Sequence, residues 1–541
     1  MRPSLPRSVR TRLETSRVVV YSLVAGALVG VLGSGLRALL DVLGDVSARV
    51  IGFRPPGTPG EGGFLQAFGG FASPDVGLTL RTLPWGLLAL PILAALAVWL
   101  RGRTSDPLEE AVRAYHESRT EPLVQRGREL GATLLAYSSG LAVGRDGPFT
   151  ALGNLSASVL SRIARLNPLE ARTLGLASVA AALGLVLHAP LASALLIVEV
   201  LYRRFEFEVE VLLAAVLASV TAYAIYGTLF GFSPLVTPEL LELPTLVQVP
   251  LYALLGLVVS FGALLVATVR AVVPSSDRWR YGLVGGAFLF GLLSAVLVYF
   301  MLEAFGDGSG WWQLGLSGFA GAEAVSQGLV RVALLLAVTW LALGGTVLTS
   351  LSAGGLLGVG LAVMLPSLGL DPVAAGLVGA AAFLTTSHNV PVAATLLLAT
   401  WSGDALLPAL LTATLLAHAV SGESSIVLTQ RRRRADSPAH GALPAPTPIE
   451  DDEPLPALPE SMLAEQLYRL PLPNAWADLP AEQVVWPDGL EFVAVVRGGE
   501  VQLSRPGQVL RGGDELMVLA TPEAFDGFAR ALGETRGSTP A

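Results

Sequence analysis

The chain has 541 residues, of which 52% are hydrophobic and only 14% are charged. A mean hydropathy of +0.61 over this length excludes an ordinary water-soluble protein and indicates a polytopic membrane protein. The net charge of -8 argues against nucleic acid as a partner. The absence of cysteine excludes disulfides, thiolate metal sites and a cysteine nucleophile.

Residues 1–17 are basic and no small-residue cleavage site follows a short apolar core, so we expect a cytoplasmic tail rather than a signal peptide. Val18–Leu43 and Leu83–Leu100 are long and apolar enough to be the first two membrane spans. Ile51–Thr79 between them is rich in Gly, Pro and Phe and indicates a loop. Pro107–His116 indicates a short amphipathic helix.

Gly144-Arg145-Asp146-Gly147-Pro148 places two charges within apolar sequence. Charges at such positions are costly and usually mark a pathway. The glycines allow the backbone to expose N–H groups, and Pro148 suits the first turn of a helix. A helix N-terminus is an anion site, so the motif predicts anion binding inside the bilayer with Asp146 as competitor. The alternative is an Arg145–Asp146 ion pair that only holds the fold.

The remaining apolar segments are numerous and several are short and interrupted by glycine, which favours broken helices. In chain order they are Phe149–Leu160, Thr173–Leu187, Leu191–Leu201, Val209–Phe230, Leu251–Val273, Tyr281–Phe300, Val330–Leu351, Gly354–Leu365, Val373–Leu384, Val392–Thr400 and Ala405–Ala419.

Arginines gather in alternate loops. The basic stretches are the N-terminus, Arg101–Arg128, Arg162–Arg172, Arg203–Arg204, Arg270–Arg280 and Arg431–Arg434. The positive-inside rule therefore predicts a multi-pass protein of the cell membrane with both termini in the cytoplasm.

The sequence contains an internal repeat. Pro190–Leu196 is similar to Pro391–Leu397, and Gly144–Pro148 can be aligned with Gly355–Val359. Two halves, at about 18–230 and 248–430, with breaks in matching places predict a substrate site near the membrane midplane.

Residues 431–460 form a linker rich in Pro and acidic residues, and residues 461–541 resemble soluble sequence. We expect short strands at Val493–Val496, Gly499–Leu503 and Leu516–Leu519, turns at Gly498-Gly499 and Gly512-Gly513, and a helix at Phe525–Leu532. The C-terminal part is therefore predicted to be a small α+β cytoplasmic domain.

Three motifs resemble the CLC chloride channel and transporter family over roughly residues 17–430. Gly144–Pro148 resembles its GREGP motif, Gly354–Val359 its GGIFAP motif, and His188–Ala192 with Ile197–Glu199 its NAPLAG and IEE segment. Members of this family are homodimers with one anion pathway per subunit. The resemblance implies an all-α polytopic membrane protein with a CLC-like fold of inverted repeats and broken helices.

The resemblance also implies site residues. Asp146 would be the gate, and backbone groups of Gly355, Leu356 and Leu357, with those of Arg145 and Gly147, would bind the anion. The family's serine ligand falls at Ser105 or Thr104, although a helix N-cap before Pro107 is an alternative role for Ser105. Its late tyrosine ligand falls near Ser424, where a hydroxyl replaces the ring.

Two departures from the family bear on mechanism. Asp146 replaces a glutamate and has about 1.5 Å less reach. The family's internal proton acceptor falls at Val200, which cannot carry a proton. Glu199 is a possible substitute on the proton path, although one helical position turns a side chain by about 100°. We therefore expect chloride movement that is channel-like or weakly proton-coupled, with proton/chloride antiport and a non-transporting anion sensor as alternatives.

The C-terminal domain resembles the C-terminal lobe of RCK-type potassium-transport regulators at Leu470–Pro473 and Gly512–Leu516, which implies a small-molecule ligand or a dimer contact. We expect His188, His388 and His418 to be structural, since they lack metal-ligand spacing. No paired catalytic carboxylates, triad or metal cluster is visible in the sequence, so neither an enzyme nor a bound cofactor is expected.

Overall fold

The computed structural model describes residues 7–51, 55–59, 85–102, 105–117, 121–239, 241–273, 280–439, 466–472, 476–484, 486, 489–497, 500–505, 507–512 and 514–520. Thr104, most of the predicted linker, Gly498-Gly499, Gly513 and the helix expected at Phe525–Leu532 lie outside these residues. The chain divides into two units, Met1–Pro444 and Ala445–Ala541, which are described separately.

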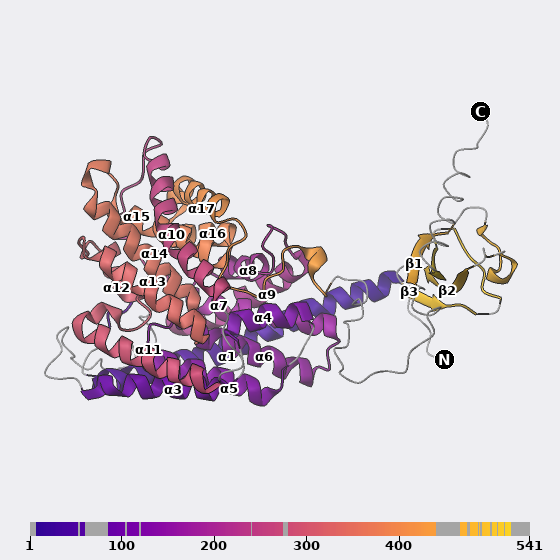
Figure 1. The fold of residues 1–541 in the computed structure, drawn as a ribbon, viewed down its shortest axis with the longest axis horizontal. Coiled ribbons are helices and arrows are strands. Elements are labelled where there is room, and N and C mark those ends of the chain that lie inside the picture. The colour runs from indigo at the N-terminus through magenta and orange to yellow at the C-terminus, as the bar shows by residue number, and fades with distance from the viewer. Residues whose placement is uncertain are drawn as a thin grey trace. The chain divides into compact units, whose positions relative to one another are not determined.

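The first unit is helical, and Figure 1 shows its helices packed side by side. Its first half comprises α1 (Arg7–Ile51), η2 (Trp85–Leu88), α3 (Ala89–Arg101), α4 (Pro107–Glu117), α5 (Leu123–Ser138), α6 (Asp146–Ile163), α7 (Pro168–Leu187), α8 (Pro190–Glu199) and α9 (Val209–Phe230). Its second half comprises α10 (Val249–Val272), α11 (Arg280–Phe300), α12 (Ser309–Leu316), α13 (Ala324–Leu341), α14 (Thr346–Met364), α15 (Pro372–His388), α16 (Pro391–Ser402) and α17 (Leu407–Ser421).

Eight helices of the described residues are long and apolar enough to cross a membrane. Others, such as α8 and α16, are too short to cross alone and pack against each other. The prediction of a polytopic α-helical membrane protein with broken helices is confirmed.

Two predicted segments, Val330–Leu351 and Gly354–Leu365, have wrong bounds, because α14 contains the end of the first and most of the second. Val330–Leu351 was expected to be continuous, but α13 ends at Leu341 and α14 begins at Thr346. The linking residues Ala342, Gly344 and Gly345 have φ of 48°, 85° and 72°. Ala342 ends α13 in the left-handed region. The glycine pair enters this region at little cost and allows α14 to start in a new direction.

The two halves repeat one arrangement of helices. In each, a Pro-led short helix follows a residue in the left-handed conformation: His188, with φ of 51°, precedes Ala189 and α8, and Asn389, with φ of 60°, precedes Val390 and α16. α7 and α15, the helices before these breaks, are buried over most of their length. The similarity between Pro190–Leu196 and Pro391–Leu397 therefore reflects equivalent helices.

The second unit contains a four-stranded antiparallel sheet in the order β1-β4-β2-β3. Its strands are β1 (Gln466–Pro471), β2 (Leu490–Arg497), β3 (Glu500–Leu503) and β4 (Glu515–Ala520). The last three match the predicted strands, whereas β1 was not expected. Alternate residues of β4, Leu516, Val518 and Ala520, are buried against a small apolar core.

Candidate anion site

The side chain of Asp146 binds the start of α14. Its Oδ2 accepts a hydrogen bond of 2.9 Å from the Val347 N–H, and its Oδ1 accepts one of 3.3 Å from the Leu348 N–H. N–H groups in the first turn of a helix have no partner within the helix and lie at the positive end of its dipole. Asp146 is 3% exposed. A buried carboxylate therefore occupies the position at which this helix end could hold a free anion.

Close backbone contact between the halves creates this geometry. The Gly144 N–H donates to the Gly345 carbonyl at 2.9 Å. A Cβ on Gly345 would lie 2.1 Å from the Gly144 oxygen, and a Cβ on Gly147 would lie 2.8 Å from the Gly345 nitrogen. No side chain fits at these positions, so the break before α6 meets the break before α14 only because both contain glycine.

The predicted residues Gly355, Leu356 and Leu357 are not at this helix start. They lie in the interior of α14, where N–H groups donate to carbonyls one turn earlier. A Cβ on Gly355 would be 2.3 Å from Trp312 Nε1, so this glycine allows close packing with α12. The assignment of the helix start to Gly354–Val359 is therefore wrong, and Thr346, Val347 and Leu348 supply the terminal N–H groups. The signal that sequence reasoning missed was the pair Gly344-Gly345 within an apolar run.

Ser105 lies in the loop before α4 and is partly buried. The helix cap is its neighbour Asp106, whose Oδ1 accepts from the Leu108 N–H at 2.9 Å, so the alternative that Ser105 caps this helix is wrong. The loop approaches α14, because a Cβ on Gly344 would lie 3.2 Å from Pro107 Cδ. Ser105 is therefore near the break, while Thr104 is outside the described residues.

Ser424 belongs to the segment that follows α17 and is only partly buried. Its neighbour Ser425 is buried and donates to the Ser387 carbonyl at 3.4 Å. The Ile426 N–H donates to the same carbonyl at 2.7 Å. This segment thus packs on the end of α15, and Ser425 presents the more buried hydroxyl.

Glu199 binds the start of α16 in the way that Asp146 binds the start of α14. Its Oε1 accepts from the Val392 N–H at 3.0 Å and its Oε2 from the Ala393 N–H at 2.7 Å. Both donors lie in the first turn of α16. The carboxylate at the end of α8 therefore joins the two Pro-led helices.

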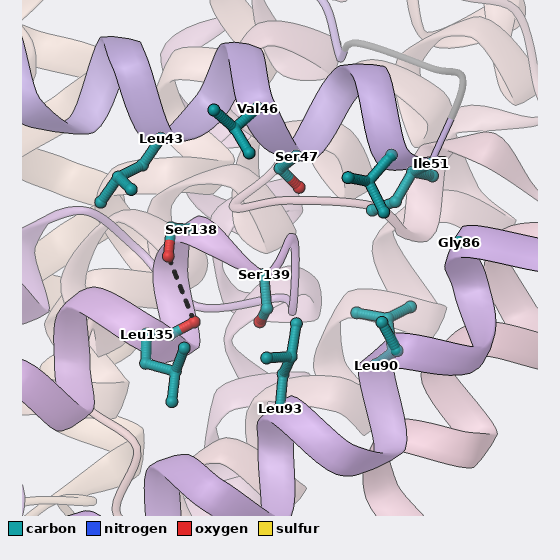
Figure 2. Close-up of a pocket in the computed structure, with 12 residues that line it drawn as sticks. Leu43, Val46, Ser47, Ile51, Gly86, Leu90, Leu93, Leu135, Ser138 and Ser139 are labelled. Atoms are coloured by element: carbon teal, nitrogen blue, oxygen red, sulfur yellow. Dashed lines mark hydrogen bonds between the residues drawn. The ribbon is translucent and has the colours of Figure 1, made fainter.

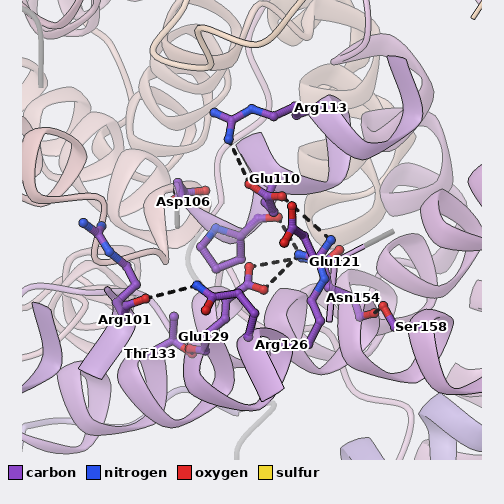
Figure 3. A network of polar contacts seen from close by, with 12 residues as sticks. Arg101, Asp106, Glu110, Arg113, Glu121, Arg126, Glu129, Thr133, Asn154 and Ser158 are labelled. Carbon is purple, nitrogen blue, oxygen red and sulfur yellow. Dashed lines mark hydrogen bonds and ion pairs between the residues drawn. The ribbon is translucent and has the colours of Figure 1, made fainter. Parts of the chain in front are cut away.

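A buried polar network fixes α6 against α4 and α5 (Figure 3). Asn154 of α6 donates to the Pro107 carbonyl at 2.9 Å and to Glu129 Oε1 at 3.3 Å. Arg126 Nη1 donates to Glu129 Oε2 at 3.0 Å. The start of α4, and with it the Ser105 loop, is held in place beside the helix that begins at Asp146.

A separate cavity of 180 Å³ lies between α1, α3 and α5 (Figure 2). None of the described residues that line it is charged, and most are apolar. Of its three serines, Ser47, Ser138 and Ser139, the last two donate to the Leu135 and Ala136 carbonyls of α5. The cavity therefore offers few donors to an anion.

Known proteins are similar to this chain over much of its length. Residues 87–422, more than half of the chain, match the family described as voltage gated chloride channel. The H(+)/Cl(-) exchange transporter ClcA of Vibrio parahaemolyticus is 26% identical over 286 residues, which cover 48% of this chain and 59% of that protein. The ClcB-like protein of Ralstonia nicotianae is 26% identical over 407 residues, 68% of this chain and 91% of that protein.

A solved structure shows the same fold. The crystal structure of a slow cyanobacterial Cl-/H+ antiporter matches with a TM-score of 0.60 over 76% of this chain and 96% of its own, at 19% identity. The matched family region ends at residue 422 and does not include the described strands of the second unit.

Proposed function

Because the chain belongs to the voltage-gated chloride channel family, we propose that it carries chloride or a similar small anion along a path gated by Asp146. The observation that carries this proposal is the pair of hydrogen bonds from the Val347 and Leu348 N–H groups to the Asp146 carboxylate. An ionised Asp146 competes with a free anion for these donors. The same donors hold the anion once the side chain leaves.

The surroundings suit an anion that must bind and then leave. Backbone N–H dipoles and hydroxyls replace part of its hydration shell without the full charge that would trap it. The N–H groups of Val347 and Leu348 take the role that the backbone groups of Leu356 and Leu357 were expected to have. Ser105 and the hydroxyls of Ser424 and Ser425 are proposed as further ligands on the inner side.

The charge of Asp146 decides whether the anion path is open. A protonated Asp146 loses its charge-assisted bonds to α14, and an anion then displaces it. Val200 offers no proton acceptor, and Glu199 is bound to the start of α16. These features favour a channel-like or weakly proton-coupled mechanism over tightly coupled proton/chloride antiport.

We further propose that the protein is a homodimer with both termini in the cytoplasm. Large apolar side chains are exposed on the Pro-led helices and their neighbours, where they would face a second copy or lipid. They include Leu191, Leu213, Val220, Leu396, Leu411 and Leu415. The proposed role of the second unit is RCK-like regulation through a small ligand or a dimer contact.

Chloride efflux from proteoliposomes tests the proposed gate. We expect Asp146→Ala to raise the chloride flux several-fold and to abolish its dependence on pH, because no carboxylate remains to compete. Wild-type flux should fall as pH rises, since the ionised carboxylate is the closed form. Flux that is the same in wild type and Asp146→Ala would exclude Asp146 as the gate, and wild-type protein without ion flux would favour the sensor.

A further inference from the structure

Three buried side chains form a hydrogen-bonded chain at the first turn of α14. His388, the last residue of α15, is fully buried. Its Nε2 lies 3.1 Å from Thr346 Oγ1, and its Nδ1 lies 2.9 Å from Ser387 Oγ. Each ring nitrogen therefore has a hydroxyl partner, and these two hydroxyls come from different helices.

Backbone groups beside the two ends of this chain bind different parts of the protein. Thr346 directly precedes Val347, whose N–H binds the Asp146 carboxylate. At the other end, the Ser387 carbonyl accepts from Ser425 Oγ and from the Ile426 N–H. The His388 carbonyl accepts from Gln430 Nε2 at 2.9 Å, so the same segment after α17 holds this end of α15.

Unpartnered hydroxyls lie on the same two helix ends. Thr385 Oγ1, Thr386 Oγ1 and Ser350 Oγ are buried and have no hydrogen-bond partner among the residues that the structure describes, and all three residues are 0% exposed. A buried hydroxyl without a partner is costly, so it indicates water or a transported ion. Ser350 lies one turn after Thr346 on α14, which indicates that such a species comes close to the chain of hydrogen bonds.

We propose that Thr346, His388 and Ser387 relay protons between the segment after α17 and Asp146. The proposal rests on the proposed gate and adds the route by which its proton arrives. A neutral imidazole donates through one nitrogen and accepts through the other, so it can take up and release a proton at opposite edges. Asp146 of α6 is the ionisable group at the end of this route, and the groups bonded to His388 are hydroxyls and the Gln430 amide.

The transfer balances without an electron acceptor. The Ser387 O–H bond breaks as Nδ1–H forms, and the Nε2–H bond breaks as a new O–H bond forms at Thr346. A water molecule carries the original Thr346 hydroxyl proton to the Asp146 carboxylate, whose hydrogen bonds come from the Val347 and Leu348 N–H groups, and a hydronium ion on the side of the segment after α17 restores the Ser387 hydroxyl. One proton has then moved to Asp146, and rotation of the hydroxyls and reversal of the tautomer reset the relay.

The test measures protons and chloride moved together in proteoliposomes under a chloride gradient. The relay implies weak proton coupling rather than a purely channel-like pore, so we expect the wild type to move some protons with chloride. His388→Gln should lower the number of protons per chloride toward zero, because glutamine cannot take up and release a proton. Thr346→Val should do the same, while Thr346→Ser, which keeps the hydroxyl, should restore the ratio. His188→Gln is the matched control, because His188 is also a buried histidine at a helix break and bonds the Ser233 carbonyl at 2.7 Å.

The outcomes separate the relay from the gate. An unchanged ratio in His388→Gln, or a wild type that moves chloride without protons, overturns the relay and leaves the gate intact. A wild type that moves no anion removes the proposed function and the relay with it. If His388→Gln does not fold, the comparison of Thr346→Val with Thr346→Ser decides, since only the former lacks the hydroxyl.

Discussion

At the scale of single residues, the site depends on three glycines without side chains as much as on the Asp146 carboxylate. Asp146 reaches the Val347 N–H because Gly144, Gly147 and Gly345 carry no side chains at the contact between the halves. The carboxylate itself was predictable, since a charge within apolar sequence is conspicuous. Its hydrogen-bond partners could not be predicted, because the type of a residue does not show whether its backbone N–H group is free.

Gly345→Ala tests this contact. The added Cβ would lie 2.1 Å from the Gly144 oxygen at a φ of +72°, so we expect a marked loss of folded, monodisperse protein on size-exclusion chromatography. Gly369→Ala is the control, because Gly369 has a φ of +62° and no atom lies within 4 Å of its added Cβ. Equal losses in the two variants would assign the effect to backbone strain rather than to the contact between the halves.

At the scale of elements, two helices begin at a carboxylate from elsewhere in the chain. α14 receives Asp146 of α6, and α16 receives Glu199 of α8. Each carboxylate supplies acceptors for N–H groups that a helix start leaves unsatisfied. We assign different roles to them because Asp146 lies where the two glycine-containing breaks meet, whereas Glu199 joins the Pro-led helices α8 and α16.

Glu199→Gln therefore tests a structural role. Loss of the charge at the start of α16 should destabilise the protein by about 1–2 kcal/mol, the range for charge-assisted bonds at a helix end. A thermal unfolding curve in detergent should show a lower midpoint with chloride flux retained. The control is Glu210→Gln, in the first turn of α9, where the side chain is exposed. An unchanged midpoint with altered proton movement would instead place Glu199 on the proton path.

Most helices could be placed from hydropathy and proline alone. α8 and α16 begin at the expected prolines, and α9 has the predicted bounds. The break before α14 was missed because Gly344-Gly345 lies within an unbroken apolar run, while the later pair Gly354-Gly355 looked more like a motif. The later glycines serve packing: a Cβ on Gly354 would lie 2.4 Å from Phe383 Cβ. Sequence does not distinguish a glycine that bends the chain from one that admits a neighbour.

At the scale of the whole molecule, the second unit has its own source of stability. The second unit has a small apolar core and a buried charged group, Asp514. Arg497 Nη2 donates to Asp514 Oδ2 at 2.6 Å and Arg497 Nε to Oδ1 at 2.8 Å. Hydrogen bonding by Arg497 lowers the pKa of Asp514 below its usual range.

The Arg497–Asp514 pair indicates how the stability of the second unit depends on acid pH. A lowered pKa means that the stabilisation is present above the unfolded-state value of about 3.9 and is lost as pH falls through the folded-state pKa. We expect Asp514→Asn to destabilise the unit at pH 7 and to remove this acid dependence, measured by hydrogen exchange of β2 and β4 in the full chain. Glu491→Gln, at an exposed site on β2, should change neither. Wild-type exchange that is insensitive to acid would contradict the assignment.

The central claim is that one set of N–H groups at the start of α14 is shared between Asp146 and a permeating anion. Anomalous diffraction from bromide-soaked crystals of wild type and Asp146→Ala tests it most directly. The account predicts a bromide peak beside the Val347 and Leu348 nitrogens in Asp146→Ala, and a weak or absent peak there in the wild type at a pH that ionises the carboxylate. Full bromide occupancy at these nitrogens with an ionised Asp146 still bound to them, or no peak there in Asp146→Ala, would contradict it.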